Sequence, residues 1–390
     1  MIPYGHQDVT AEDIEAVVQV LRSDFLTQGP AVPRFERAVM DLVNARHAVA
    51  VNSATSALHV ACMALGMGPG DLLWTVPNTF VASANCARYC GADVDFVDID
   101  PRSWNMSVAA LSDKLVRAQR AGRLPQVVVP VHFSGQPTSQ EAIRELSLRY
   151  GFKVLEDASH SIGASRHGEP AGSCRWSDIT VFSFHPVKIV TSAEGGMALT
   201  NDPEIAERMR MLRTHGITRD PQRLRWAPSS SAPGEPLSPP AWHYEQQMLG
   251  FNYRMTDVQA ALGASQLTRL RTYVGQRNEI ARRYDRMLQD LPLQLPHVES
   301  GNVSAFHLYV VRLRGPRREA FDRLRQMGIG VNVHYTPVHL QPYYRELGFA
   351  EGQFPEAEAY GAHSLTLPLY PGLTEPMQEQ VVAALRAALG

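Results

Sequence analysis

The first 200 residues alternate short apolar runs with helix-like segments, and this alternation constrains the fold more than any other feature of the chain. Strands that alternate with helices form a mostly parallel sheet with helices on its faces. The apolar runs end in polar residues near positions 53, 76, 132, 157 and 183. Because ligands bind outside the carboxyl ends of strands in open α/β sheets, we expect these strand ends to line one functional edge.

Length and composition favour two domains. A chain of 390 residues, 44% of them hydrophobic, exceeds the size at which a single core stops growing. We predict a large domain over residues 1–245 and a smaller C-terminal domain over residues 246–390. A stretch rich in proline and serine at 220–240 is predicted to be a surface loop, either a lid or a tolerated insertion.

Local patterns predict several individual elements. Thr10, with Asp13 three residues later, forms a capping box that opens a helix with one apolar face. The run 125–131 is predicted to be a buried strand. Thr256 predicts the start of a long helix, and 307–313 predicts a strand of the C-terminal domain.

Charge, cysteine spacing and hydropathy argue against several classes of protein. A nucleic-acid-binding domain usually has a basic face, whereas the formal net charge here is −2. Of four cysteines only Cys86 and Cys90 are close together, so no metal site is expected. Neither a run of 18 apolar residues nor a secretory leader is evident. We expect a cytoplasmic protein with reduced cysteines and no membrane partner.

Lys188 is the main candidate for a reacting side chain. It follows the strand-like run 178–182 and comes shortly before Gly195 and Gly196. Burial lowers the pKa of a lysine and makes its amine nucleophilic toward carbonyls, which is the property that pyridoxal phosphate (PLP) enzymes use. Taken alone, however, a lysine after a strand is more often a solvated residue at the rim of a domain.

Asp157 ends a similar short apolar run upstream of Lys188. A carboxylate at this place could keep a pyridine nitrogen protonated, and a protonated ring accepts the electrons released when a Cα–H bond breaks. The alternative reading of Asp157 is a helix N-cap that follows a strand.

Two further strand ends carry residues suited to a phosphorylated aromatic ligand. Ser53, Ala54 and Thr55 begin a helix, where backbone N–H groups and the helix dipole favour a phosphate. Phe80 follows another strand and could stack on a flat ring. Ordinary helix capping and core packing are the alternatives for these positions.

In this order and spacing, the segments resemble the sugar aminotransferases of the DegT/DnrJ/EryC1/StrS family over nearly the whole chain. Several phrases are most similar to the nucleotide-sugar C4 aminotransferases of pseudaminic acid biosynthesis. These phrases lie at 23–30, 52–58, 131–136, 183–188, 251–255 and 332–335. The resemblance implies an α/β protein with the PLP-dependent transferase fold of type I: a mostly parallel seven-stranded sheet flanked by helices, plus a smaller C-terminal α+β domain.

The resemblance also implies a role for each matching residue. Lys188 would carry the cofactor, Asp157 would pair with its pyridine nitrogen, and His160, where most relatives have glutamine, would lie near its ring hydroxyl. Cofactor binding is implied for Ser53, Ala54, Thr55, Phe80, Asp157, His160, Ser183, Lys188 and Asn252, the last reaching the phosphate of a neighbouring subunit. Substrate contacts are implied for His185, Tyr253, Arg254, His334 and Tyr335. From the residues alone, this arginine and these histidines could equally be surface or structural groups.

The implied activity is transfer of an amino group from L-glutamate to C4 of a UDP-linked 4-keto-6-deoxy N-acetylhexosamine, by a homodimer with shared active sites. Alternatives are dTDP- or GDP-linked sugars and amination at C3. Sugar dehydratases of this kind have histidine in place of the lysine, so Lys188 favours transamination. A noncatalytic ligand-binding protein on this fold would be expected to lack the pairing of Lys188 with Asp157. A nicotinamide oxidoreductase would need a Gly-x-Gly-x-x-Gly turn after a strand, and the sequence has none.

Overall fold

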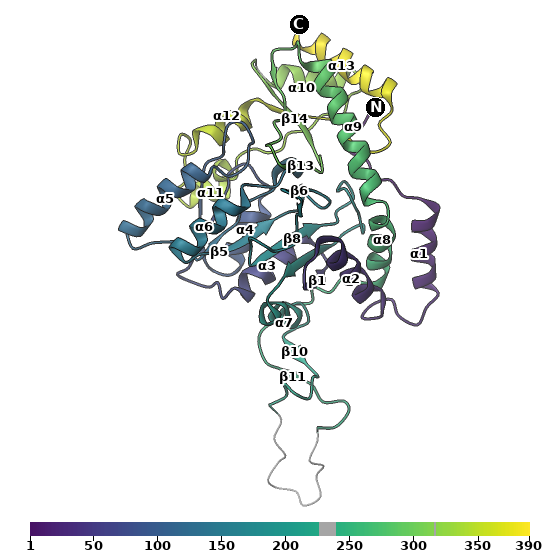
Figure 1. Ribbon diagram of the computed structural model, residues 1–390, viewed down its shortest axis with the longest axis vertical. Helices are drawn as coiled ribbons and strands as arrows, with labels where there is room; N and C mark the ends of the chain where they lie inside the picture. Colours follow the sequence, from purple (N-terminus) through teal and green to yellow (C-terminus); the bar gives the residue numbers. More distant parts are fainter. Residues whose placement is uncertain (226–238, 316) are drawn as a thin grey trace, which may run out of the picture.

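The computed structural model describes residues 1–225, 239–315 and 317–390. Figure 1 shows a central sheet-and-helix body, a smaller C-terminal unit above it, and a two-stranded ribbon that extends below it. The ribbon pairs β10 (Ile217–Thr218) with β11 (Glu245–Gln246). Much of the loop predicted at 220–240, namely residues 226–238, lies outside the described residues.

A seven-stranded sheet forms the centre of the body. Its order is β1 (His47–Val51), β9 (Gly196–Thr200), β8 (Ile179–Ser183), β5 (Lys153–Asp157), β4 (Val127–Val128), β2 (Leu72–Thr75) and β3 (Asp93–Phe96). The five strands from β8 to β3 pair in parallel, and β9 runs antiparallel to both of its neighbours. The predicted mostly parallel sheet is therefore confirmed. The strand predicted at 125–131 is shorter, because Pro125 and Pro130 have no N–H to donate to the ladder.

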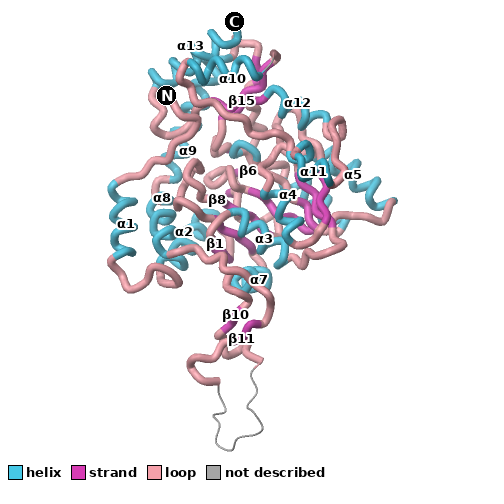
Figure 2. Tube along the Cα trace, turned by 180° about the vertical axis from the view of Figure 1, so that it is seen from behind, coloured by secondary structure: helices cyan, strands magenta, loops and turns pink. Residues whose placement is uncertain are grey.

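Helices cover both faces of this sheet, as the view from behind in Figure 2 also shows. In chain order the helices of the body are α1 (Ala11–Leu21), α2 (Ala31–Val43), α3 (Ala54–Ala64), α4 (Ala82–Tyr89), α5 (Val108–Arg120), α6 (Gln140–Tyr150), α7 (Pro203–Leu212) and α8 (Asp257–Leu267), and α1 packs on α8. Helix α3 packs on β8, β9, α4 and α7, whereas α2 packs on β1 and α8. Within the described residues, no helix combines the length and the apolar composition needed to cross a bilayer.

The start of α1 is held to α8 by a buried carboxylate. The Asp13 side chain is fully buried and accepts a hydrogen bond from the backbone N–H of Thr10 at 3.0 Å, as the predicted capping box requires. It also accepts from Ser265 Oγ and Gln266 Nε2, both at 2.6 Å, and pairs with Arg269 at 2.5 Å. Burial alone would raise the pKa of Asp13, but the hydrogen bonds from Arg269 and Ser265 lower it below its usual value. The predicted helix start at Thr256 is confirmed at α8.

The C-terminal unit has its own sheet and core. Its strands are β12 (Leu293–Gln294), β14 (Tyr309–Leu313) and β15 (Ser364–Leu367), and its helices are α9 (Leu270–Leu288), α10 (Arg317–Gln326), α11 (Pro342–Glu346), α12 (Pro355–His363) and α13 (Glu375–Leu389). A separate small sheet pairs β6 (Ser165–Arg166) with β7 (Glu169–Pro170) and β13 (Asn302–Val303).

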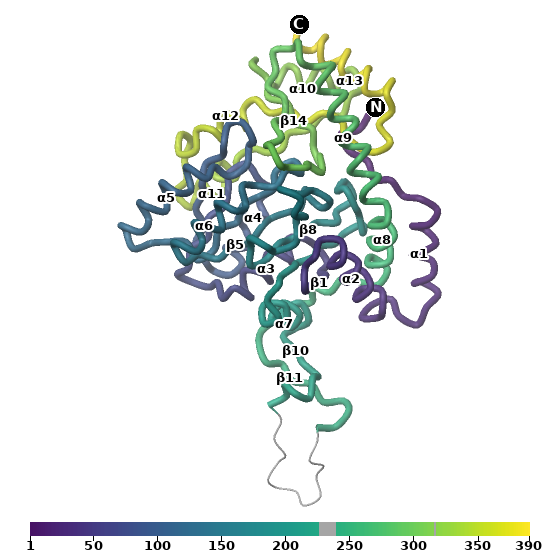
Figure 3. The backbone as a smooth tube through the Cα atoms, in the orientation of Figure 1, coloured from purple at the N-terminus to yellow at the C-terminus, as the bar shows by residue number. Residues whose placement is uncertain are grey.

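The first residues of the chain belong to this C-terminal unit. Ile2 donates to Gly328 O at 2.9 Å and accepts from the N–H of Gly330 at 2.7 Å, and its side chain packs in the C-terminal core. Figure 3 shows the purple N-terminal segment beside the yellow C-terminal end. Conversely, α8 packs on α1 and α2 in the large unit. The boundary between residues 245 and 246 stays a prediction.

Candidate active site

The carboxyl ends of β5 and β8 open onto a cavity of ≈ 810 Å³, which also contains residues from the C-terminal unit. The cavity brings together most of the residues singled out in the sequence: Ser53, Ala54, Thr55, Phe80, Asp157, His160, Ser183, His185, Lys188, His334 and Tyr335. Asn252, Tyr253 and Arg254 do not line it. The arrangement agrees with the expectation that polar strand ends meet at one edge of the sheet.

Lys188 reaches into this cavity from the loop that follows β8. Its Nζ lies 3.5 Å from Nε2 of His307, which comes from the segment before β14. Burial lowers the pKa of Lys188 to about 8, and the Asp157 carboxylate partly opposes this shift. At pH 7 about one amine in ten is then neutral, which is the form that attacks a carbonyl.

Asp157 is the last residue of β5, and its carboxylate is held from one side. Oδ2 accepts a hydrogen bond from Ser83 Oγ at 2.6 Å, and Oδ1 accepts from the backbone N–H of Ser159 at 3.1 Å. Thr79 Oγ1 lies 2.8 Å from Ser83 Oγ and extends this chain of hydroxyl groups. The side chain is 5% exposed and lines the cavity, so its remaining acceptor positions can serve a ligand.

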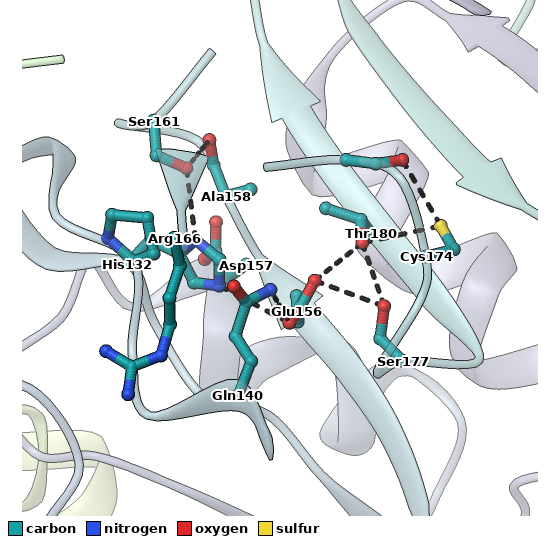
Figure 4. Close-up of polar contacts among 12 residues, drawn as sticks. His132, Gln140, Glu156, Asp157, Ala158, Ser161, Arg166, Cys174, Ser177 and Thr180 are labelled. Atoms are coloured by element: carbon teal, nitrogen blue, oxygen red, sulfur yellow. Dashed lines mark hydrogen bonds and ion pairs between the residues drawn. The ribbon is translucent and has the colours of Figure 1, made fainter. Parts of the chain in front are cut away.

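The neighbouring residue on β5, Glu156, points to the opposite face of the sheet, where Figure 4 shows a network of buried polar groups. Glu156 accepts hydrogen bonds from Gln140 at 2.5 Å, Thr180 at 2.7 Å and Ser177 at 3.1 Å, and lies 3.6 Å from Nε2 of His132. Burial alone would raise its pKa, but His132 and these hydrogen bonds lower it. The network ties β5 to β8 and α6, and it thereby fixes the position of Asp157.

The start of α3 has the geometry expected of an anion-binding site. Ser53 caps the helix by accepting from the N–H of Ser56 at 3.1 Å, while the first N–H groups of a helix have no partner within the helix. Gly196 of β9 packs against this turn so closely that an added Cβ would lie 2.4 Å from the carbonyl carbon and oxygen of Ser53. Only glycine fits at 196 without moving the turn.

Three buried histidines and a tyrosine line one part of the cavity. The rings of His160 and His307 lie 4.4 Å apart, and the Tyr335 hydroxyl lies 3.3 Å from Nε2 of His160. Burial and the positive charge of Lys188 lower the pKa of His160 and His307 well below the usual range, and that of His334 to about 3. These imidazoles are therefore neutral at pH 7.

Phe80 and His185, two of the predicted site residues, lie at the mouth of the cavity and are exposed. Phe80 is 57% exposed at the mouth of the cavity, 6.2 Å from the ring of Tyr335, so it is not a core residue. His185 lies on the rim, 4.0 Å from Glu194. Its exposure leaves it accessible to a ligand at the mouth.

The segment that carries Asn252, Tyr253 and Arg254 lies outside the cavity of its own chain. Tyr253 stacks on Phe251 with ring centroids 4.8 Å apart and contacts His59 through its hydroxyl at 3.2 Å. Asn252 is exposed. Among the described residues, no carboxylate lies within ion-pair distance of Arg254.

Sequence reasoning did not identify several residues of the site. Ser83 could have been found, because it stands four residues after Thr79 on the helix that follows Phe80. His307 and Tyr4, which also lines the cavity, had no local signal because the packing of the C-terminal unit brings them there. In the described ranges, no group of three His, Cys, Asp or Glu side chains is arranged to hold a metal ion.

Comparison with known proteins adds a family match and three similar proteins to this geometry. Residues 7–386 match the model of the DegT/DnrJ/EryC1/StrS aminotransferase family. The spore coat polysaccharide biosynthesis protein SpsC of Bacillus subtilis (strain 168) is 37% identical over 393 residues, covering 99% of this chain and 96% of SpsC. PseC of Helicobacter pylori, an aminotransferase involved in the biosynthesis of pseudoaminic acid, has a TM-score of 0.88 at 28% identity, covering 99% of this chain and 98% of that one. The aminotransferase TlmJ of Streptoalloteichus hindustanus has a TM-score of 0.88 at 30% identity, and the match covers 100% of this chain and 99% of the TlmJ chain.

Proposed function

Because the chain belongs to the DegT/DnrJ/EryC1/StrS aminotransferase family, we propose that Lys188 is the lysine that carries the cofactor and moves the proton during amination of a nucleotide-linked keto sugar. Aminotransferases of this family depend on PLP, so this chain is a PLP-dependent sugar aminotransferase. The observation that carries the proposal is the position of the Lys188 amine, in a cavity that also holds Asp157 and the start of α3.

The residues around Lys188 fit the cofactor in three ways. A buried carboxylate, Asp157, is available for a pyridine nitrogen, and the start of α3 with Thr55 and Ser183 is available for a phosphate. Nδ1 of His160 is buried without a partner among the described residues, so it can serve the ring hydroxyl. Phe80 is free to cover a flat ring. When bound, PLP supplies an electron sink that stabilises the carbanion formed at the carbon next to nitrogen.

The chain itself supplies the acid and base. Lys188, with a pKa of about 8, can take a proton from the amino donor in its neutral form and return it to the sugar carbon in its charged form. The Asp157 carboxylate would pair with a protonated pyridine nitrogen, and the neutral imidazoles add no competing positive charge near Lys188. We propose L-glutamate as the amino donor.

For the acceptor we propose a UDP-linked 4-keto-6-deoxy N-acetylhexosamine that is aminated at C4, as in pseudaminic acid biosynthesis. The phrases at 23–30, 131–136 and 183–188 and the structural likeness to PseC support this choice. His185, His334 and Tyr335 are the polar groups placed to contact the sugar. A second candidate is a different nucleotide-linked keto sugar, since the 37% identical SpsC is a spore coat polysaccharide biosynthesis protein.

Charge in the cavity supports a homodimer with shared sites. A diphosphate and a dicarboxylate both need cationic partners, yet Lys188 is the only lysine or arginine among the described residues that line the cavity. Arg254 has a planar group suited to either anion and no ion-pair partner in the described chain. We propose that the segment of Asn252 and Arg254 completes the site of a second copy of the chain.

Reduction with borohydride tests the cofactor assignment. The purified protein loaded with PLP should absorb visible light, and after reduction peptide mapping should find the cofactor on Lys188. Lys188→Ala should lose this linkage, whereas Lys153→Ala, which removes an exposed lysine at the far end of β5, should keep it. A label on another lysine, or none in cofactor-loaded protein, would contradict the assignment.

A panel of sugar nucleotides tests the acceptor. With glutamate as donor, kcat/KM should be highest for UDP-linked 4-keto-6-deoxy N-acetylhexosamines and lower for dTDP-4-keto-6-deoxyglucose. The difference should be about 10- to 200-fold, the range typical of one missing apolar contact. If the dTDP sugar is preferred by tenfold or more, the general aminotransferase activity stands and the pseudaminic acid assignment does not.

Subunit mixing tests the shared site. Lys188→Ala removes the amine, and Asn252→Asp places a carboxylate against the bound phosphate, so each variant alone should be nearly inactive. In a mixed dimer one site has both native residues and the other has both changes. Up to about half of the normal activity per dimer should therefore return. No recovery after confirmed subunit exchange would place Asn252 outside the partner's site.

A further inference from the structure

The Lys188 amine has one side-chain hydrogen-bond partner in the described chain, and that partner comes from the other structural unit. Nε2 of His307 lies 3.5 Å from Lys188 Nζ. The His307 side chain belongs to the segment just before β14, whereas Lys188 follows β8, so the contact joins two distant segments that both line the cavity. Neither the motif around Lys188 nor the strand pattern at 307–313 accounts for this contact.

The backbone of His307 is held firmly, which fixes where its ring can lie. Arg277, a buried arginine of α9, donates to the carbonyl oxygens of Phe306 at 3.1 Å and His307 at 3.3 Å. Gly135 has a φ of +106° and allows a close approach, since an added Cβ would lie within 3.0 Å of the backbone of Phe306, His307 and His160. The imidazole is 5% exposed and packs 4.4 Å from the ring of His160.

The titratable and charged groups around the contact between Lys188 and His307 are Asp157, His160, His334, Tyr335 and Arg277. Burial and the cations Lys188 and Arg277 disfavour a second positive charge on His307, so its ring keeps one nitrogen lone pair. A neutral imidazole is an acceptor for an ammonium group, whereas an imidazolium would repel it.

We propose that His307 is a positioning residue for Lys188: Nε2 accepts a hydrogen bond from the amine whenever Lys188 is not attached to the cofactor, and keeps that amine inside the cavity beside the reacting carbon. This inference rests on the proposed role of Lys188. It assigns to His307 the task of holding a flexible lysine between the two half-reactions, when the amine would otherwise sample several rotamers.

The test measures the reactivity of Lys188 in the protein without cofactor. Cyanate adds to a neutral amine to form a urea, so the rate at Lys188 as a function of pH, followed by peptide mass spectrometry, reports the pKa of the amine. The native protein should show a pKa of about 8. Two variants of His307 separate the two ring nitrogens. A glutamine side chain places its amide near the position of histidine Nε2, whereas the shorter asparagine side chain places its amide only near the position of Nδ1.

His307→Asn should therefore lower the pKa of Lys188 by about one unit, because the buried ammonium loses its acceptor, which corresponds to about 1.4 kcal/mol. His307→Gln should restore the native value. His339→Asn, a matched change at another buried histidine that contacts Glu358 away from the cavity, should leave it unchanged. Circular dichroism confirms that each variant is folded.

Two results separate the inference from the function on which it rests. If borohydride labels Lys188 but His307→Asn shifts the pKa by less than about a third of a unit, His307 does not position the amine, and the cofactor assignment stands. Equal shifts in the Asn and Gln variants would likewise overturn the inference, since they would indicate a general packing effect. If borohydride labels a different lysine, the cofactor assignment itself fails.

Discussion

Replacing Asp157 with asparagine removes one charge at the point where the cofactor ring is expected to lie and changes little else. The carboxylate is buried, and its known partners are the Ser83 hydroxyl at 2.6 Å and the Ser159 N–H at 3.1 Å. An asparagine keeps one acceptor oxygen for the N–H, and a hydroxyl can turn to accept from the new amide. The fold should therefore tolerate the change.

The expected loss can be worked from these contacts. Asp157→Asn turns a charge-assisted hydrogen bond to the pyridine nitrogen into a neutral one, which costs about 1.5–3 kcal/mol. The reaction also loses the protonated ring that accepts electrons. Together these effects predict a fall of at least about 100-fold in rate, equivalent to about 2.7 kcal/mol. Ser83→Ala removes the hydroxyl that donates to the Asp157 carboxylate but leaves the charge in place, so it should cost less, about tenfold, or about 1.4 kcal/mol.

The assay is a single-turnover reaction of the PLP-loaded protein with glutamate, followed by loss of the visible band in a stopped-flow instrument. Asp290→Asn, an exposed aspartate paired with Arg386, serves as the control and should react at the native rate. Cofactor content is measured beside each rate, so that loss of PLP is not mistaken for loss of reactivity. A fully loaded Asp157→Asn protein that reacts within threefold of the native rate would mean that Asp157 is only a structural cap.

Two further predictions concern glycine packing and stability. Gly196→Ala should weaken PLP binding at least about tenfold in equilibrium dialysis, because the added Cβ displaces the start of α3. Gly68→Ala is the control: a Cβ added there has no atom within 4 Å, so this variant should bind PLP with native affinity. Asp13→Asn should lower the free energy of unfolding in urea by about 2 kcal/mol at pH 7, since the carboxylate accepts charge-assisted hydrogen bonds. The pKa of Asp13 is depressed in the folded state, so its contribution is present above about pH 4 and is lost as pH falls through the folded value. The difference between native protein and variant should therefore disappear in acid, and a constant difference would refute this explanation.

Local sequence patterns were sufficient for the candidate residues at or just after a strand end. Lys188, Asp157 and Ser53 stand at the ends of apolar strands, and parallel strands bring such ends to one edge, so their meeting in one cavity could be predicted. The family and the fold type inferred from the motifs are confirmed by the comparisons. The residue roles themselves remain proposals until they are tested.

Long-range packing limited the rest of the prediction. His307 was read only as part of a strand, because its contact with Lys188 depends on how the C-terminal unit docks over the sheet. Tyr4 reaches the same cavity because Ile2 joins that unit, a pairing across more than 300 residues that no local pattern encodes. Pro130 shortened a strand that an apolar run alone would extend.

The pairing of Ile2 with Gly328 and Gly330 has a consequence for the order in which the protein is made. The ribosome synthesises residues 2–4 more than 300 residues before their partners, which include Leu369, whose N–H donates to Tyr4 O. At about 5–20 residues per second this segment waits roughly 20 to 70 s. The central sheet can form during that interval, whereas the C-terminal unit and the part of the cavity that contains Tyr4 can form only after Leu369 has emerged. A nascent chain stopped before residue 328 should therefore contain the sheet without a complete active site.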